Sequence, residues 1–106
     1  MKGFSEKEKR RINEEKNFLF ECILSLSTVE ECYGFFEDLC TPKEIEEMSK
    51  RMKAAKMLSD GKIYTEVAEK TGLSTATISR VSRCIKDGDE GYTAVLERMK
   101  SEAEAK

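Results

Sequence analysis

The sequence predicts an all-α protein of about six helices, and three observations support that prediction. Apolar residues recur at three- and four-residue steps, the spacing of one helix face. No stretch alternates apolar and polar residues as a half-buried strand does. Helix start signals separate the segments. A chain of 106 residues corresponds to one domain, so we expect a single domain over residues 1–106 with flexible ends at 1–10 and 101–106.

The first half of the chain predicts two helices. One runs over about residues 5–26, where the charged start gives way to an apolar stripe. Ser27 and Glu30 have the spacing of a capping box, in which the hydroxyl accepts a first-turn amide and the carboxylate reaches back to the amide of the N-cap residue. A second helix over 29–39 follows. The expected stripe residues are Ile12, Leu19, Cys22, Ile23 and Leu26, then Val29, Cys32, Tyr33, Phe36 and Leu39.

A third helix is predicted from residue 42 to about residue 60. Thr41 is a good N-cap, Pro42 fits the first helical position, and Glu44 completes a capping box. Gly61 is a plausible stop, because glycine tolerates the backbone that ends many helices. The expected buried stripe is Ile45, Met48, Met52, Ala55 and Leu58.

Two short helical patterns flank Gly72-Leu73-Ser74 and predict a helix-turn-helix over about residues 64–86. Gly72 supplies the left-handed backbone of the tight turn, Leu73 plugs the angle between the helices, and Ser74 caps the second helix. A last helix follows the Gly-rich GDEGY. Val67, Ala68 and Thr71 are expected to face inward from the first helix, and Ile78, Val81 and Ile85 from the second.

The outward face of the second helix carries short side chains followed by two arginines. Hydroxyls near a helix N-terminus can approach base edges, a methyl group can meet a thymine methyl, and arginines can contact phosphate or guanine. This face predicts double-stranded DNA as the partner. The alternative is a small protein–protein adaptor that uses the helical hairpin as a docking surface. The candidate DNA-binding residues on this helix are Thr75, Ala76, Thr77, Ser79, Arg80 and Arg83.

The net charge of −2 is unevenly distributed along the chain. Residues 17–48 sum to −7, whereas residues 49–86 sum to +6. One basic block in an acidic protein indicates a local anion-binding face, and this block contains the helix-turn-helix. The alternative is that these charges only solvate helix surfaces.

Several function classes are excluded or disfavoured. The chain contains no His, which excludes His-based catalytic triads and His-ligated metals. The four cysteines form no C-x-x-C pair and are expected to be small packing residues, so we expect no metal and no cofactor. No apolar run is long enough for a bilayer span, and MKGFSEKEKRR does not resemble a signal peptide. We expect a cytoplasmic, nucleoid-associated protein of a bacterium that is not an enzyme.

Aromatic residues are concentrated in the acidic first half of the chain. Two helices in so small a domain offer little interior for them. A monomer core could bury them, but we favour a homodimer interface. These residues are Phe18, Phe20, Tyr33, Phe35 and Phe36.

The segment from Leu39 to about Met99 resembles the tryptophan repressor superfamily, and specifically its small YerC/YecD-like branch. The residues that carry the resemblance are DLCTPKEIEEMSKRMKAAKML, GKIYTEVAEKTGLSTATISRVSRCI and GDEGY. It implies an intertwined homodimer whose N-terminal helices interlock and whose second helix of the helix-turn-helix enters the major groove. Thr65 corresponds to a position that reads a base in that family.

The resemblance also implies a possible effector pocket. Arg51 and Arg80 match two arginines that sandwich the corepressor's indole in the family. Val81, however, replaces a glycine that leaves room for that ligand. We therefore expect no response to tryptophan, and another effector or none remains possible. The full candidate set is Thr41, Arg51, Thr77, Arg80, Val81 and Cys84, where Cys84 replaces a serine.

Overall fold

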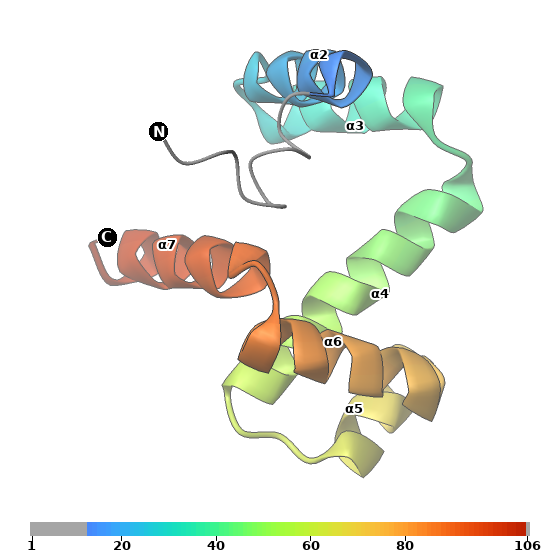
Figure 1. The fold of residues 1–106 in the computed structure, drawn as a ribbon, viewed down its shortest axis with the longest axis vertical. Coiled ribbons are helices and arrows are strands. Elements are labelled where there is room, and N and C mark those ends of the chain that lie inside the picture. Colours follow the sequence, from blue (N-terminus) through green and yellow to red (C-terminus); the bar gives the residue numbers. More distant parts are fainter. Residues whose placement is uncertain (1–12, 106) are drawn as a thin grey trace, which may run out of the picture. The chain divides into compact units, whose positions relative to one another are not determined.

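A computed structural model describes residues 13–105, and in this range every regular element is an α-helix (Figure 1). The predicted all-α fold of about six helices is confirmed. The chain divides into two compact units between Leu39 and Cys40, and the expected single domain stays a prediction. The helices, labelled as in Figure 1, are α2 (Glu14–Leu24), α3 (Val29–Leu39), α4 (Pro42–Ser59), α5 (Tyr64–Thr71), α6 (Thr75–Asp87) and α7 (Gly91–Ala105).

Helix α2 is shorter than the sequence predicted. Asn13 caps its start, because the Asn13 side chain accepts the Lys16 N–H at 3.0 Å. At the other end the Ser25 hydroxyl donates to the Cys22 carbonyl at 2.6 Å, and the helix stops at Leu24 rather than Leu26. Residues 5–12 of the expected helix lie outside the described residues. Local side-chain hydrogen bonds therefore set both ends of α2.

The capping box of α3 lies one residue later than predicted. Thr28, not Ser27, accepts the Glu31 N–H (3.0 Å), and the Thr28 N–H donates to Glu31 Oε1 (3.2 Å). The Ser27 N–H also donates to Glu31 Oε1, at 2.7 Å. Because one Glu31 oxygen accepts two amides, this register satisfies more of the backbone than a box that pairs Ser27 with Glu30.

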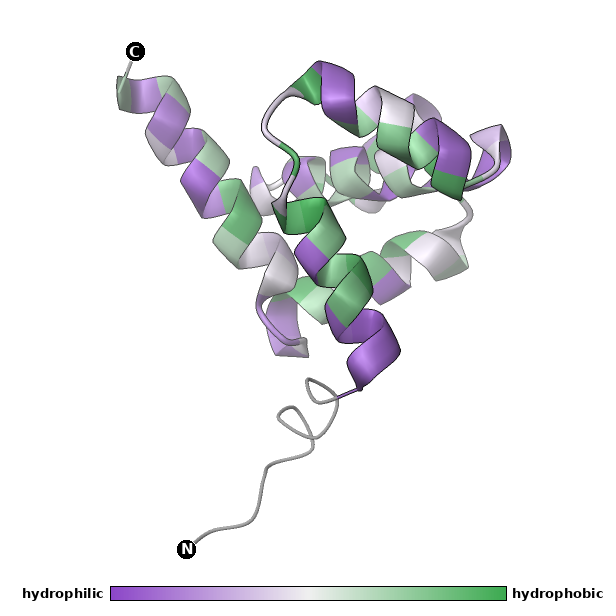
Figure 2. Ribbon diagram, turned by 90° about the horizontal axis from the view of Figure 1, so that it is seen from above, coloured by the Kyte–Doolittle hydropathy of each residue, from purple (hydrophilic) through white to green (hydrophobic). Residues whose placement is uncertain are grey.

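The first unit has no interior within residues 13–39. Neither α2 nor α3 contains a buried residue. Phe18 is 69% exposed and Tyr33 is 68% exposed. Figure 2 shows that the residues of α2 change from hydrophilic in the first turn to mostly hydrophobic after it. Phe35 and Phe36 meet edge to face with ring centroids 5.3 Å apart. The described residues of the two predicted stripes are half-buried or exposed, so the single chain leaves much of this apolar surface uncovered.

The second unit is built on α4, whose ends agree with the prediction. Thr41 and Glu44 form the predicted capping box with Pro42 in the first turn. The helix ends at Ser59, and Gly61 has a positive φ of 87°. Figure 1 shows α5 and α6 packed around the C-terminal half of α4, and α7 leading away from α6.

The buried face of α4 differs from the predicted stripe. Ala54 and Ala55 are fully buried, whereas Met52 is 37% exposed. Two small residues face the bundle because both α5 and α6 pack against α4, and small side chains let helices approach closely. The prediction included Ala55 but missed Ala54.

Helix α7 packs against α6 and α4 but buries none of its own residues. It follows Glu90, which has a positive φ of 66°. Val95 and Met99, one helical turn apart, are 44% and 58% exposed. The helix includes residues 101–105, for which the sequence predicted flexibility.

Candidate nucleic-acid interface

The turn between α5 and α6 has the backbone that the sequence predicted. Gly72 has a φ of 75°, and its N–H donates to the Ala68 carbonyl at 2.9 Å. A Cβ added to Gly72 would meet no atom within 4 Å. Glycine is therefore favoured here by its left-handed conformation and not by lack of space.

Thr71 fixes this turn from inside. Its side chain is 6% exposed, and its hydroxyl donates to the Val67 carbonyl at 2.7 Å. The same hydroxyl accepts the Leu73 N–H at 3.2 Å. A buried amide in a turn needs a partner, and Thr71 supplies it. The sequence indicated that Thr71 faces inward but gave no sign of this double role.

A small core holds α5 and α6 on α4. Val67 and Ile78 are fully buried, Leu73 is 7% exposed and Val81 is 1% exposed, as the sequence predicted for each. Ala68 and Ile85 are half-buried. Ser82 is 6% exposed and was missed by the sequence analysis, because a serine on a polar-looking helix gives no burial signal. This core holds the outer face of α6 in a fixed orientation relative to α4.

The first turn of α6 is capped by Ser74. The Ser74 hydroxyl accepts the Thr77 N–H at 3.1 Å and lies 3.0 Å from the Thr77 hydroxyl. The first turn of α6 contains no acidic residue. The positive end of the helix dipole is therefore not neutralised by a carboxylate of its own first turn.

The predicted DNA-binding residues fall into two groups by exposure. Thr77 and Ser79 are half-buried at the edge of the face. Arg80 and Arg83 form no ion pair with any residue that the structure describes. The five exposed members of the set are Thr65, Thr75, Ala76, Arg80 and Arg83. The N-terminus of α6 carries short side chains, and the two exposed arginines follow it. Together they form a surface that can contact a polyanion.

Lys53 makes a contact between α4 and α5 that the sequence did not indicate. Its Nζ donates to the Lys70 carbonyl at 3.4 Å. A cation beside the last turn of α5 is favourable, because the helix dipole is negative there. No sequence signal could have found this contact, because residues 53 and 70 are brought together only by the fold.

The residues of the possible effector pocket are in different environments. Val81 is buried, whereas Arg51, Thr77 and Cys84 are half-buried and Arg80 is exposed. The Thr41 hydroxyl accepts the Glu44 N–H at 3.2 Å within the capping box. Thr41 lies ten residues before Arg51, about 15 Å along α4 at 1.5 Å per residue. One small ligand cannot readily reach both from a single chain, and the pocket stays a prediction.

Glu44, in the first turn of α4, has a pKa below the ordinary value of a glutamate. The backbone hydrogen bond from Thr41 lowers the pKa of Glu44, and the side-chain hydrogen bond of Thr41 adds to this effect. The Thr41 N–H donates to Glu44 Oε1 at 2.8 Å. The shift therefore belongs to helix capping at the start of α4.

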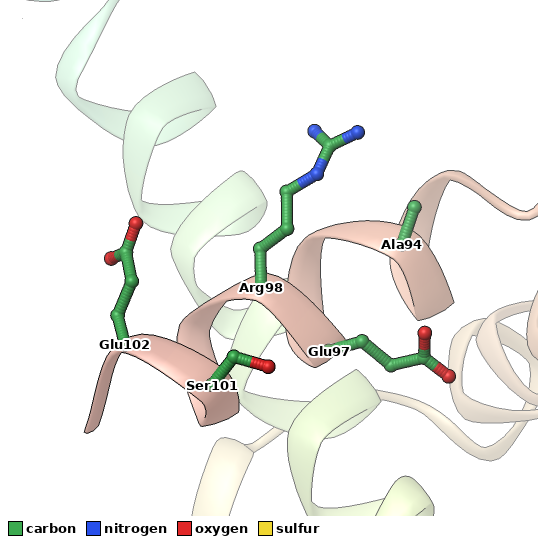
Figure 3. Close-up of a pocket in the computed structure, with 5 residues that line it drawn as sticks. All are labelled: Ala94, Glu97, Arg98, Ser101 and Glu102. Carbon is green, nitrogen blue, oxygen red and sulfur yellow. The ribbon is translucent and has the colours of Figure 1, made fainter. Parts of the chain in front are cut away.

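A surface hollow on α7 offers no convincing ligand site. Ala94, Glu97, Arg98, Ser101 and Glu102 line it. Figure 3 shows that all five come from one helix and that the Arg98 side chain extends away from both carboxylates. Across residues 13–105 no cluster of His, Cys, Asp and Glu could hold a metal ion. Within the same range no helix is both long and apolar enough to span a membrane.

Comparison with known proteins identifies the family. Residues 14–100 match the family model described as Trp repressor protein. The chain belongs to the Trp repressor family. The uncharacterized protein YerC of Bacillus subtilis (strain 168) is a relative with 49% identity over 86 residues, which are 81% of this chain and 83% of YerC.

Two solved structures show the same fold. A TrpR like protein from Eubacterium eligens ATCC 27750 has 47% identity and a TM-score of 0.82, over 87% of this chain and 95% of that one. The crystal structure of a Staphylococcus aureus protein, 44% identical, also has a TM-score of 0.82 and covers 92% of this chain and 96% of its own. The predicted resemblance to the Trp repressor family is confirmed.

Proposed function

We propose that this protein is a sequence-specific, DNA-binding transcriptional regulator that places α6 in the major groove. The outer face of α6 is the observation that carries the proposal. Short side chains lie at its N-terminus, and two exposed arginines without ion pairs in the described chain follow. A rigid core beneath α6 holds this face in place, and an α-helix fits the major groove of B-DNA.

The experiment is selection of bound fragments from a random duplex library, followed by affinity measurements at several salt concentrations. Specific binding predicts an enriched motif and an affinity that falls linearly with salt on logarithmic axes. A protein–protein adaptor predicts neither. Absence of both results would refute the proposed function.

The arginines of α6 give a sharper test. Arg80→Ala and Arg83→Ala should each weaken DNA binding, while stability changes by less than about 0.5 kcal/mol because both side chains are exposed. A base contact would lose about 1–3 kcal/mol of discrimination at one position, whereas a phosphate contact would weaken all sequences and flatten the salt slope. Arg98→Ala on α7 is the matched control. Wild-type affinity in both α6 variants would show that α6 is not the recognition helix.

We also propose that the regulator is a homodimer. Helices α2, α3 and α7 bury no residue, yet together they carry Phe18, Tyr33 and Met99 with more than half of each residue exposed. Monomeric proteins rarely leave large apolar surfaces uncovered. A second copy supplies the same surfaces in return, which is the arrangement of an isologous interface.

Light scattering at micromolar concentration should give about twice the chain mass of 12.1 kDa. Tyr33→Glu should shift the protein towards monomer or unfold it, because a charge would replace an exposed ring at the interface. Glu69→Lys on α5, an exposed charge reversal outside α2, α3 and α7, is the control. A well-folded wild-type monomer would refute the dimer.

We propose further that tryptophan does not switch this protein. Val81 is 1% exposed and packed into the core of the helix-turn-helix. Its χ1 is stiff in a helix, so the side chain cannot fold away to admit a ligand. A ligand shifts an equilibrium only by its different affinity for the two states, and a filled space offers little difference.

Calorimetry with millimolar tryptophan, alongside DNA binding with and without it, tests this proposal. We expect no heat and no gain in affinity. Val81→Gly should open the space and allow tryptophan to bind. It should lower the stability of the domain by about 1 kcal/mol for glycine in a helix and by about 1.5–3 kcal/mol for the lost burial of the valine side chain. A tenfold gain in DNA affinity of the wild type with tryptophan would refute the proposal.

In a bacterial cell we place the protein in the cytoplasm, on the nucleoid.

A further inference from the structure

The hydroxyls of Ser74 and Thr77 form a hydrogen-bonded pair at the start of α6. One of their two hydroxyl hydrogens is not used in the bond between them. Ser74 Oγ accepts the Thr77 N–H at 3.1 Å, and the two hydroxyl oxygens lie 3.0 Å apart. Two hydroxyls carry two hydrogens, and the bond between them uses one. Neither hydroxyl makes another hydrogen bond within the described residues.

The environment decides which hydroxyl keeps the spare hydrogen. Ser74 Oγ is already an acceptor of a backbone amide, and accepting a hydrogen bond polarises the O–H and makes it a better donor. Ser74 therefore donates to Thr77 Oγ1. The hydrogen that remains is on Thr77, which is half-buried at the edge of the face that carries Ala76 and Arg80.

We propose that Ser74 is a positioning residue that makes Thr77 a hydrogen-bond donor towards DNA. A threonine hydroxyl has one hydrogen to donate and two lone pairs that accept. The bond from Ser74 occupies one lone pair of Thr77 Oγ1 and leaves the Thr77 hydrogen free to donate. The free hydrogen of Thr77 then suits an acceptor on the DNA, which is either a phosphate oxygen or a base-edge acceptor such as purine N7 or thymine O4. This inference rests on the proposed function.

The experiment uses the full-length protein and the duplex obtained by selection. One set of duplexes lacks a single purine N7 or thymine O4 at a time, and a second set carries a single uncharged methylphosphonate at a time. Four variants are compared with the wild type. Thr77→Val removes the donor, Ser74→Gly removes the partner while keeping a tolerated N-cap residue, and Ser74→Thr keeps a capping hydroxyl. Thr93→Val is the matched control on α7, where the Thr93 hydroxyl donates to the Glu90 carbonyl at 3.1 Å.

We expect the wild type to lose about fivefold or more in affinity at one substituted position, as for loss of one hydrogen bond. A loss in the base set identifies a base acceptor, and a loss in the methylphosphonate set identifies a phosphate. Thr77→Val and Ser74→Gly should bind the unmodified duplex more weakly and show no further loss at that position. Ser74→Thr and Thr93→Val should respond like the wild type.

A wild-type response in Ser74→Gly would overturn the role of Ser74, and a wild-type response in Thr77→Val would overturn the donor assignment. If Ser74→Gly fails to fold, Thr77→Val still tests the donor assignment. Failure of the wild type to bind any duplex would instead refute the proposed function, so the two failures are distinguishable.

Discussion

Replacing Thr71 by Val tests whether one buried hydroxyl holds the turn of the helix-turn-helix. Valine has the shape of threonine, so the substitution removes the hydroxyl and leaves the packing nearly unchanged. The Val67 carbonyl loses the 2.7 Å bond, but it lies inside α5 and keeps an intrahelical partner. The Leu73 N–H loses its 3.2 Å acceptor, and this amide is in a buried turn.

The cost of the substitution is therefore the cost of one unsatisfied buried amide. That cost is about 1–3 kcal/mol in free energy of unfolding, and the burial of an extra methyl offsets part of it. For a domain of this size, each kcal/mol lowers the thermal midpoint by about 4–8 °C. Because dimerisation would make stability depend on concentration, all variants are compared at one protein concentration.

Urea unfolding followed by circular dichroism measures the change. Thr93→Val is the matched control, because the Thr93 hydroxyl donates to a carbonyl at 3.1 Å and accepts no amide from residues 13–105. Its loss leaves no buried N–H and should change stability by less than about 0.5 kcal/mol. If Thr71→Val unfolds within 0.5 kcal/mol of the wild type, the turn does not depend on this hydroxyl.

Two further predictions concern backbone and capping. Gly72→Ala should lower the free energy of unfolding by about 1 kcal/mol, which is the strain of a left-handed L-residue, because an added Cβ meets no atom within 4 Å. Gly72→Asn should lose less stability, because asparagine tolerates this conformation. Equal losses in the two variants would contradict the backbone explanation. The lowered pKa of Glu44 means that its contribution is complete above the ordinary glutamate pKa and is lost as the pH falls through the lowered value. Glu44→Gln should therefore flatten the stability of α4 against pH in that acidic window, measured by amide exchange of its first turn, and an unchanged pH profile would contradict this role.

The elements predicted correctly from sequence are those that depend on local chemistry. Thr41-Pro42 with Glu44 starts α4 because all three residues act within one helical turn. Gly72 and Leu73 mark the turn because few residues tolerate its backbone or fill its corner. The box at α3 was misplaced because the Ser27–Glu30 and Thr28–Glu31 pairs have the same spacing, and only the three-dimensional backbone distinguishes them.

Features that depend on tertiary packing could not be predicted in the same way. Which side of α4 faces α5 and α6 decides that Ala54 is buried and Met52 is partly exposed. Both residues fit an apolar stripe, so the pattern cannot separate them. The candidate DNA-binding face was predicted residue by residue, yet the half-burial of Thr77 and Ser79 depends on the core beneath α6. The pairing of Ser74 with Thr77 appears only when both hydroxyls are placed.

The uneven charge along the chain is compatible with the proposed DNA-binding surface on an acidic protein. Residues 17–48 sum to −7 and residues 49–86 to +6, whereas the whole chain sums to −2. At physiological ionic strength the Debye length is about 8 Å, so a phosphate at α6 experiences chiefly the charges that lie within about that distance. Arg80 and Arg83 are exposed, and the first turn of α6 has no carboxylate. Local charge on α6, rather than net charge, therefore governs whether this face attracts a polyanion, and the acidic remainder disfavours contact through other surfaces.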